Sequence, residues 1–379
     1  MSRGAVARIR HRLTRRAYRW LYVAYRSVTR TGPPRQLRAS DLERILIVRN
    51  DAVGDLIVTT PILSYLAEVA PHAEVDILAS SANHSLITGD SRVHKCYVSP
   101  HNAREWLALL HRLRDRRYDV TYSLRYGRAL REGFIATAVA CDNTQKVSVF
   151  RPKRYQGFFT TVIRTPRRTT HMSQRLLYVV QASLAHDAAS KREPFAAYPM
   201  TLQIGTKEQQ SADQFLTSAG VRAFVAVNFS AREPDRDWPI QSCANVIRQL
   251  ARQHPDLSFV LIPPASRAGD AASIVASCAA LPVVIFPPSP NLLALAALIQ
   301  RARIVITPDT AAVHIASACG RPVLGLYLHL KTRLWTPLGV PHRLVQAAPG
   351  APIAAIPDQE IIGAFELLYE ETLPKIARR

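Results

Sequence analysis

The sequence predicts an α/β protein in which two doubly wound, Rossmann-like domains follow a basic extension and face a central cleft. Apolar runs of strand length alternate with helical segments in two series along the chain, which is typical of βαβ units and parallel sheets. With 379 residues, 48% of them hydrophobic, the chain is long enough for two domains with separate cores. Folds of this kind bind ligands beyond the carboxyl ends of their strands, so we expect the site in the cleft.

The first series predicts an N-terminal domain over residues 41–195. We expect strands at residues 44–49, 74–79, 96–98 and 119–124, and helices at residues 56–70, 103–116 and 171–185. Residues 151–168 are basic and interrupted by prolines, which favours a loop. This loop is either solvent-facing surface or a cationic wall that faces an anionic acceptor.

The second series predicts a C-terminal domain over residues 205–350, after a linker at residues 191–199. We expect strands at residues 224–230, 257–262, 283–286, 304–306 and 323–326, and helices at residues 239–253, 269–280 and 291–301. The segment 356–379 contains a last helix, at about residues 358–373. We expect this helix to pack back on the N-terminal domain.

The positive charge of the chain is concentrated at its start. The formal net charge is +21, and residues 1–40 contribute eleven arginines and no acidic residue. Aromatic side chains such as Trp20 and Tyr22 lie among these arginines, a composition typical of an amphipathic helix on an anionic membrane surface. A disordered basic tail and a nucleic-acid-binding arm are the alternatives, but no nucleic-acid motif accompanies the arginines.

Several other classes of protein are disfavoured. No apolar run approaches the ~20 residues that cross a bilayer, and arginines interrupt every candidate signal-peptide core. The five cysteines are scattered without metal-ligand spacing, which indicates free thiols in a reducing compartment.

The stretch IVITPDTAAVHIASA, residues 304–318, predicts a strand, a tight turn and the start of a helix. Thr307, Asp309 and Thr310 are candidate caps for this helix, whose first turn presents unpaired N–H groups and the positive end of the helix dipole. Such an N-terminus binds phosphate oxygens. His314 lies one turn after Thr310, on the same face. The alternative is an ordinary capped βα unit with a surface histidine.

The loop at residues 50–55 follows the first predicted strand. Gly54 permits a tight backbone turn there, and Asp55 begins the next helix, where the helix dipole favours an ionised carboxylate that accepts a proton from a hydroxyl. Alternatively, Asp55 only caps the helix, and Asp51 competes for any catalytic role. The loop has neither a GxGxxG nor a GxxxxGK pattern, so neither a nicotinamide fingerprint nor a P-loop is supported.

The loop NFSAREPDRDWP, residues 228–239, supplies hydroxyl and cationic groups. Ser230 is a candidate partner of a phosphate oxygen, while Arg232 and Arg236 are candidates to neutralise a leaving diphosphate. Asp235 and Asp237 form a DxD pattern, which binds a divalent metal in some sugar-transferring enzymes. Their position at a helix start favours capping over metal binding.

Together, these three loops predict an acidic base on one domain and a phosphate cradle with a cation on the other. That arrangement suits transfer of a group from a diphosphate donor to an acceptor hydroxyl. The base takes the proton, while backbone amides, Arg236 and Thr310 stabilise the departing charge.

These residues resemble glycosyltransferase family nine, the bacterial ADP-heptose:lipopolysaccharide heptosyltransferases. The resemblance covers roughly residues 44–347 and depends on five motifs in the family's order. They read ILIVRNDAVGDLIVTTPIL, HMSQRLLYVVQASL, RDWP, PDTAAVHIASACGRPVLGLY and WTPLG.

The resemblance implies a GT-B fold and an inverting, metal-independent glycosyltransferase that needs no cofactor. The donor is a nucleotide sugar, most simply ADP-heptose, and the acceptor is an anionic glycolipid or lipopolysaccharide core. The enzyme then works in the cytoplasm, peripheral to the inner face of the cytoplasmic membrane, with no nucleic acid as a partner. The site residues that it implies are Asp55 as base, Ser230, Arg236, Asp309, Thr310, Ala311 and His314 on the donor side, and Gly54 and Arg125 on the acceptor side.

The chain also departs from the family pattern. Ala311 replaces the glycine of an Asp-Thr-Gly turn, which restricts φ and adds a methyl group where backbone meets phosphate. Arg236 replaces a lysine, which keeps the charge but changes its geometry. The loop SLRYGR around Arg125 lacks the family's Asp-x-Gln-Gly pattern. A non-catalytic sugar-nucleotide or glycolipid-binding protein on the same fold is therefore the alternative function.

Overall fold

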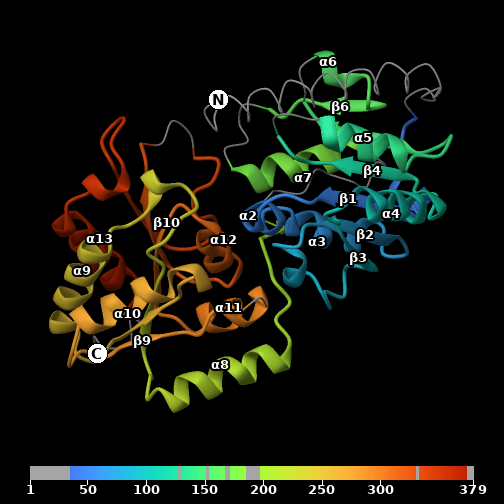
Figure 1. Ribbon diagram of the computed structural model, residues 1–379. Coiled ribbons are helices and arrows are strands. Elements are labelled where there is room, and N and C mark those ends of the chain that lie inside the picture. Colours follow the sequence, from blue (N-terminus) through green and yellow to red (C-terminus); the bar gives the residue numbers. More distant parts are fainter. Residues whose placement is uncertain are drawn as a thin grey trace, which may run out of the picture.

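The computed structural model describes residues 35–126, 130–150, 153–166, 171–184, 197–289, 291–329 and 333–373. These residues form two α/β domains side by side, each built on a six-stranded parallel sheet (Figure 1). The strand orders are β3-β2-β1-β4-β5-β6 and β12-β11-β10-β7-β8-β9. Counted within its own domain, each sheet has the order 3-2-1-4-5-6, which is that of a doubly wound dinucleotide-binding fold. The predicted fold class is therefore confirmed.

The N-terminal sheet begins with β1, whose buried apolar run pairs with β2 on one side and β4 on the other. The strands are β1 (Arg44–Arg49), β2 (Glu74–Ala79), β3 (Lys95–Val98), β4 (Val120–Ser123), β5 (Gln145–Val149) and β6 (Thr161–Ile163). The helices are α2 (Val53–Ile57), α3 (Thr60–Val69), α4 (Ala103–Asp115), α5 (Leu130–Ala138), α6 (Lys153–Gln156) and α7 (Met172–Ser183), with short 3₁₀ turns η1 (Ala39–Asp41) and η2 (His84–Leu86).

The C-terminal sheet repeats this plan. Its strands are β7 (Phe224–Val227), β8 (Ser258–Leu261), β9 (Val283–Ile285), β10 (Ile304–Pro308), β11 (Val323–Tyr327) and β12 (His342–Gln346). Its helices are α8 (Thr206–Ser218), α9 (Ile240–Gln253), α10 (Ala268–Ser277), α11 (Leu292–Ile299), α12 (Ala311–Ala318) and α13 (Asp358–Thr372), with 3₁₀ turns η4 (Pro234–Arg236), η5 (Ala265–Arg267) and η6 (Ile353–Ala355).

Two expectations for the N-terminal domain were wrong. The single helix expected at residues 56–70 is two helices, α2 and α3, because Pro61 stands in the first turn of α3; a proline lacks the N–H of a continuing helix and its ring collides with the preceding turn. The loop expected at residues 151–168 contains α6 and the edge strand β6, which pairs with β5.

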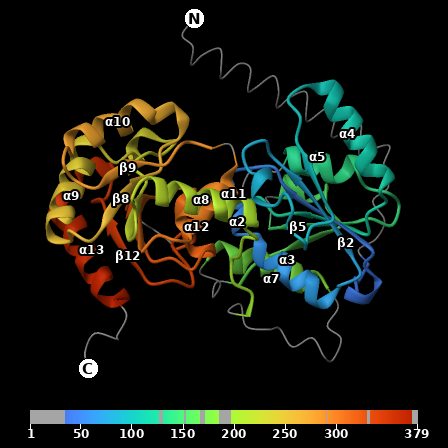
Figure 2. The ribbon, with the colours of Figure 1, turned by 90° about the horizontal axis from the view of Figure 1, so that it is seen from below.

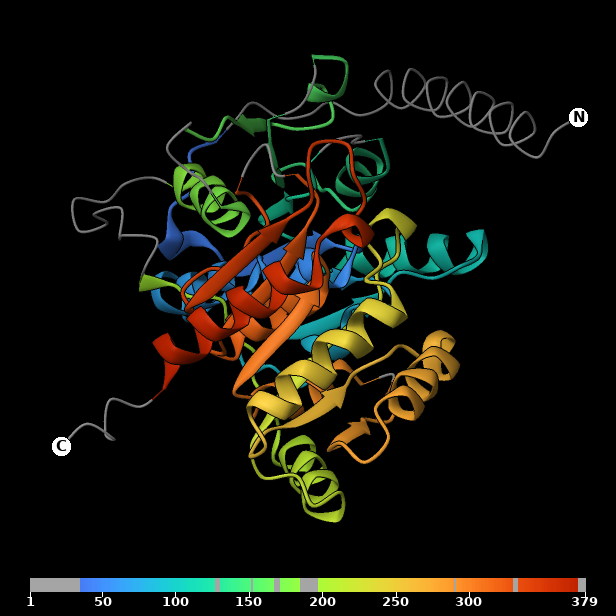
Figure 3. The same cartoon turned by 90° about the vertical axis from the view of Figure 1, so that its left-hand side faces the viewer.

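The position of the last helix also differs from the expectation. Instead of returning to the N-terminal domain, α13 packs on α9 and on the edge of the C-terminal sheet, as Figure 3 shows. The reason is its apolar face, since Ile361, Ile362, Phe365 and Leu368 are buried in the cluster that also contains α9 and β7 side chains. Burial of this face stabilises the C-terminal domain itself.

The basic extension lies largely outside the described residues, which begin at Arg35. The few described residues of the extension are part of the N-terminal domain, because Leu37 is buried and forms a parallel bridge with Leu184. The Arg35 backbone N–H also donates to the Gln145 side chain. Within the described ranges, no helix combines the length and the apolar character needed to span a membrane.

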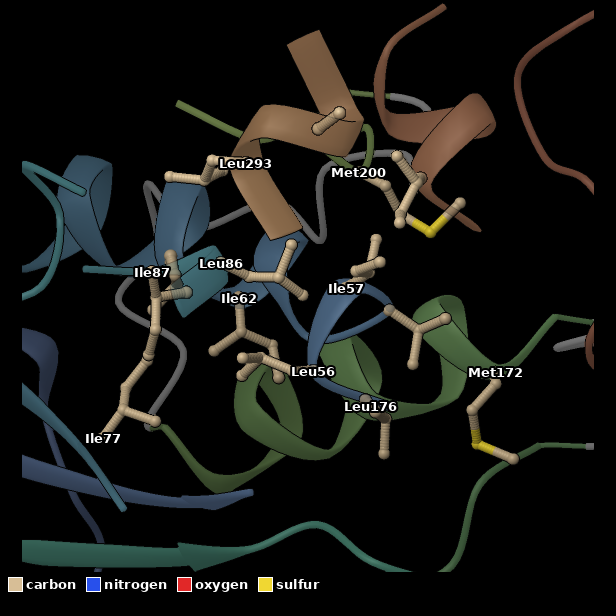
Figure 4. Packing of buried hydrophobic residues seen from close by; sticks show 14 of the residues in the cluster. Leu56, Ile57, Ile62, Ile77, Leu86, Ile87, Met172, Leu176, Met200 and Leu293 are labelled. Atoms are coloured by element: carbon tan, nitrogen blue, oxygen red, sulfur yellow. The ribbon is translucent and has the colours of Figure 1, made fainter. Parts of the chain in front are cut away.

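One apolar cluster continues across the boundary between the two domains. It includes Leu56 and Ile57 of α2, Leu86 of η2 and Leu293 of α11 (Figure 4). In Figure 2, α2 lies beside α11 and α12 at this junction, and α2 is in direct contact with α12. The helix that carries Asp55 therefore packs against the helix that begins after Thr310.

Candidate active site

Arg49 organises the loop after β1. Its side chain is only 1% exposed, and it lies between two carboxylates, with Nη1 at 3.3 Å from Asp51 Oδ2 and Nη2 at 3.1 Å from Asp55 Oδ1. Nη2 also donates to the Asp55 carbonyl oxygen. Because a guanidinium presents several donors in a fixed plane, this one side chain fixes both the backbone and the carboxylate of Asp55.

A buried asparagine forms hydrogen bonds with the backbone of the same loop. Asn83 Nδ2 donates to the Arg49 carbonyl oxygen at 2.9 Å and lies 3.3 Å from those of Asp51 and Ala52. Ser80 Oγ donates to the Asp51 carbonyl oxygen at 2.9 Å. The loop is therefore held in one conformation by side chains that follow β2, the neighbouring strand. Sequence reasoning missed Asn83.

Gly54 lies at the contact between α2 and α12. A Cβ atom at this position would be 2.8 Å from His314 Cδ2, closer than such atoms approach in practice, so a side chain here would separate the two helices. Gly54 was expected on the acceptor side, but it faces α12 and lines neither of the two cavities described below. Its small size permits the close approach of the domains.

His314 is part of this contact rather than of a phosphate site. It is 3% exposed, and its ring lies edge-on to His171 and Trp335, with centroids 6.3 and 5.7 Å away. Burial, together with a smaller effect of His171, lowers the pKa of His314 to about 3. The ring is therefore neutral near pH 7 and supplies no positive charge to a donor.

A second pair of interdomain contacts involves the start of α7. His171 Nε2 donates to the Thr336 carbonyl oxygen at 3.0 Å, since its Nδ1 accepts from the Ser173 N–H. The Met172 N–H donates to the Leu334 carbonyl oxygen at 2.9 Å. Burial lowers the pKa of His171 to about 4. The HM and WTPLG motifs of the sequence therefore meet at the domain junction.

The turn after β10 forms the predicted helix cap. Thr310 is the N-cap of α12, and its Oγ1 accepts from the Ala312 N–H at 3.3 Å. Asn228, directly after β7, donates to both Thr307 Oγ1 and Thr310 Oγ1 at 3.0 Å. Asn228 Oδ1 in turn accepts from the Ser230 N–H at 3.2 Å. Asn228 was not singled out in the sequence, yet it joins the two halves of the cradle.

Ala311 does not strain the turn. It is the first residue of α12, and it is absent from the residues with positive φ. An L-residue therefore adopts this backbone freely, and the expected restriction on φ has no consequence here. The φ of Ala311 therefore gives no support to the alternative of a non-catalytic protein.

Arg236 and Asp309 are paired with each other. Arg236 Nη1 donates to Asp309 Oδ2 at 3.2 Å, and the two side chains are 37% and 21% exposed. Burial raises the pKa of Asp309, the nearby Arg236 opposes this rise, and Glu233 adds to it. Neither residue lines the two cavities described below.

The first cavity, of about 690 Å³, lies mainly in the C-terminal domain. Its lining includes the cradle residues Ser230, Thr310 and Ala311, and also Val53 of α2 from the N-terminal domain. Apolar side chains make up much of the remaining lining, among them Ile262, Pro263, Phe286, Pro287 and Leu295. This cavity therefore combines apolar lining with the N-terminus of a helix, where anions bind.

The second cavity, of about 480 Å³, lies beside the loop after β1. Its lining is polar and basic, and includes Asp51, Asp55, Arg125 and Arg131. Arg125 is partly neutralised by the buried Glu132, 3.1 Å away. Arg232 lines both cavities. A carboxylate therefore stands in a cationic cavity directly beside the cradle.

Asp237, the second aspartate of the DxD pattern, has a structural role. Asp237 Oδ1 accepts from the Ala231 N–H at 2.6 Å, and its Oδ2 pairs with Arg267 at 2.6 Å. Both oxygens of Asp237 are thus engaged, while Asp235 is exposed. Across the described part of the chain, no group of three or more His, Cys, Asp or Glu side chains is placed to hold a metal ion.

Among the residues predicted from the sequence, those that line the two cavities are Asp51, Asp55, Arg125, Ser230, Arg232, Thr310 and Ala311. Gly54 and His314 instead form the contact between α2 and α12, and Arg236 and Asp309 form an ion pair outside the cavities. Arg49 and Asn83 were missed because a strand-end arginine and a loop asparagine carry no signal of their partners in the sequence.

The ionisation of Asp51 should make stability depend on pH. Burial raises the pKa of Asp51 from 3.8 to about 6, against the opposing effect of Arg49. Between these pH values the folded chain binds more protons than the unfolded chain, so its stability falls as pH rises through the window and is constant above it. Because one pKa unit corresponds to ~1.4 kcal/mol, the effect is on the order of 3 kcal/mol.

Urea unfolding of wild type and Asp51→Asn at pH 4, 5, 6 and 7.5 measures this effect. Asparagine cannot ionise, so the stability of the variant relative to wild type should rise from pH 4 to pH 6 and then level off. A difference that stays constant over this range would show that Asp51 titrates normally.

The fold and its two cavities define the class of the protein. Two doubly wound domains with substrate-sized cavities at their junction are the architecture of a GT-B glycosyltransferase. A crystal structure of a glycosyl transferase family 9 protein from Veillonella parvula has the same fold, with a TM-score of 0.73, 19% identity, and coverage of 88% of this chain and 99% of that one. An Escherichia coli ADP-heptose lipopolysaccharide heptosyltransferase II structure gives a TM-score of 0.67 at 20% identity, covering 86% and 99%.

The family follows from the sequence comparison. The profile of glycosyltransferase family 9 (heptosyltransferase) matches residues 106–352, and this chain belongs to that family. The lipopolysaccharide core heptosyltransferase OpsX of Haemophilus influenzae is 25% identical over 291 residues, which are 75% of this chain and 79% of the relative. The chain is therefore a glycosyltransferase of the heptosyltransferase family, as the sequence motifs predicted.

Proposed function

We propose that this enzyme transfers heptose from ADP-heptose to a lipopolysaccharide core saccharide, with inversion at the anomeric carbon and without a metal ion. Its family and its relatives, which include a lipopolysaccharide core heptosyltransferase, support this substrate pair. The first cavity has features that a nucleoside diphosphate needs, since its apolar lining suits the base and the N-terminus of α12 suits the phosphates.

The second cavity is the proposed acceptor site. Its arginines, Arg125 and Arg131 among them, complement the phosphate or carboxylate groups of an anionic glycolipid. In the proposed reaction, Asp55 removes the proton of an acceptor hydroxyl as that oxygen bonds to the anomeric carbon. The bond from this carbon to the diphosphate oxygen breaks on the opposite face, and ADP leaves with the electron pair.

The observation that carries this proposal is the contact between α2 and α12. It sets the helix of the candidate base against the helix of the phosphate cradle, and Val53, two residues before Asp55, lines the same cavity as Thr310. A displacement between a diphosphate sugar and a hydroxyl needs this proximity.

The test is to incubate the protein with ADP-heptose and a heptose-deficient lipopolysaccharide core glycolipid, and to weigh the product by mass spectrometry. We expect the mass of one heptose to be added, also in the presence of EDTA. UDP- and GDP-sugars serve as competing donors. Absence of any transferred sugar across this panel, with a folded protein, would refute the proposed function.

The basic extension is proposed to hold the enzyme at the inner face of the cytoplasmic membrane, near its lipid-linked acceptor. Residues 1–34 carry nine arginines and no acidic residue, and each basic side chain near an anionic bilayer contributes about 1 kcal/mol of attraction. This attraction weakens as salt is added.

Deletion of residues 1–34 should therefore lower the affinity for phosphatidylglycerol vesicles at least tenfold at about 0.1 M salt. The deletion ends before Leu37, which is buried in the N-terminal domain. Transfer to a delipidated, soluble acceptor should persist. Unchanged vesicle binding, measured by co-sedimentation, would exclude the extension as the membrane contact, and a loss of DNA binding instead would indicate a nucleic-acid arm.

A further inference from the structure

Arg232 occupies a position in the site that no other described residue shares. It follows β7 in the loop that contains the cradle residue Ser230. It lines both the first cavity, which is large enough for a nucleotide, and the second cavity, which contains Asp55. Any molecule that extends from one cavity into the other passes this side chain. A donor sugar bound with its phosphates at Thr310 must do so, because its anomeric carbon has to reach the acceptor near Asp55.

The guanidinium of Arg232 is also available to a ligand. It is exposed, and within the described ranges no hydrogen bond or ion pair engages it. Arg236 differs in its pairing and in its position. Its guanidinium is paired with Asp309 at 3.2 Å, and it lines neither cavity. Arg236, which aligns with the family's basic position, is therefore already engaged by Asp309. Arg232, four residues earlier, has no such partner among the described residues and lies where the two cavities meet.

The chemistry at this junction requires a cation. As the bond between the anomeric carbon and the diphosphate oxygen breaks, the electron pair moves onto that oxygen and adds negative charge to the diphosphate. A guanidinium donates two parallel hydrogen bonds to phosphate oxygens and keeps its charge at all relevant pH values. A donor held ready where charge develops contributes about 10²- to 10³-fold to kcat in comparable sites.

We propose that Arg232, rather than Arg236, is the catalytic cation that binds the departing diphosphate. This inference rests on the proposed function, since it assumes a diphosphate sugar that spans the two cavities. Arg236 then has a positioning role, in which it holds Asp309 beside the cradle turn.

Steady-state kinetics of Arg232→Ala and the matched variant Arg236→Ala test this assignment, with ADP-heptose and a heptose-deficient core glycolipid as substrates. Arg232→Ala should lower kcat about 100-fold and weaken product inhibition by ADP, while the KM for the acceptor changes little. Arg232→Lys should recover part of the loss. Neither change at residue 232 should alter the thermal midpoint, because the side chain is exposed and has no partner among the described residues.

Chemical rescue separates contact with the reacting group from a structural effect. Guanidinium chloride at tens of millimolar should restore part of kcat in Arg232→Ala and none in Arg236→Ala. A larger kcat loss in Arg236→Ala, rescued by guanidinium, would overturn the proposal in favour of Arg236. An effect of Arg232→Ala on the acceptor KM alone would overturn it too, because it would assign Arg232 to the acceptor.

Calorimetric titration with ADP distinguishes failure of this inference from failure of the proposed function. If wild type transfers heptose and Arg232→Ala matches it in kcat and ADP affinity, the inference fails and the function stands. If wild type transfers nothing but binds ADP through Arg232, the function fails and the diphosphate contact stands. If wild type neither transfers heptose nor binds ADP, both fail.

Discussion

Replacement of Asp55 by asparagine is expected to lower kcat by about 10²- to 10⁴-fold, the usual contribution of a general base. Asparagine has nearly the same shape and still accepts a hydrogen bond from Arg49, but it cannot take a proton. Residue 55 does not line the first cavity, the proposed nucleotide site, so the affinity for ADP should stay within about twofold of wild type. The measurement is kcat by mass-spectrometric product quantification, with ADP binding by calorimetry.

Asp235→Asn is the matched control for this experiment. It is the same chemical change at an exposed carboxylate outside both cavities, and it should leave kcat unaltered. If Asp55→Asn retains more than about a tenth of wild-type kcat, the base lies elsewhere, and Asp51 on the same cavity wall becomes the candidate. If Asp235→Asn is the inactive variant instead, a role for the DxD pattern must be reconsidered.

The architecture was readable from the sequence because buried parallel strands are continuous apolar runs. The strands near residues 44–49 and 304–306, with polar turns after them, are of this kind, and they lie at the centres of the two sheets. The edge strands β6 and β12 were missed, since His342–Gln346 mixes polar and apolar residues and is half exposed. β5 was missed for a related reason, because Gln145 and Lys146 interrupt its apolar pattern although both are buried.

The candidate site was predictable only where the chemistry is local. Thr310 caps its own helix, so the cradle follows from a few adjacent residues. Asn228 contacts Thr307 and Thr310 from about 80 residues away, and a single sequence does not reveal such a distance in space. The contacts of His314 were not predicted for the same reason. One helical turn after Thr310 places it on the cap face, but the opposite domain covers that face through Gly54.

Arg49→Met is expected to destabilise the fold by about 3–5 kcal/mol at pH 7.5, the usual cost of removing one partner of a buried ion pair. Arg49 is 1% exposed and compensates Asp51, whose side chain is 6% exposed, as well as Asp55. Methionine fills much of the same volume but leaves the carboxylates without their cation. Urea unfolding gives the free energy. Arg343→Met, which breaks the exposed pair with Glu371, should change it by at most about 1 kcal/mol.

The dependence of this loss on pH and on Asp51 identifies its cause. In wild type, burial already raises the pKa of Asp51 to about 6, and Arg49 and Arg125 oppose this rise. Without Arg49, the larger of these two opposing charges, the pKa rises further. The Asp51 carboxyl of Arg49→Met is then protonated at pH 5, so the loss of stability should shrink at pH 5 relative to pH 7.5. For the same reason, Arg49→Met combined with Asp51→Asn should recover about 1–3 kcal/mol, the coupling energy typical of contacting residues. A loss that is equal at both pH values, with nothing recovered by the second substitution, would contradict this explanation. Arg49 would then stabilise the loop through packing and its hydrogen bond to the Asp55 carbonyl oxygen rather than through charge. Asp55 would in that case owe its position to the backbone alone.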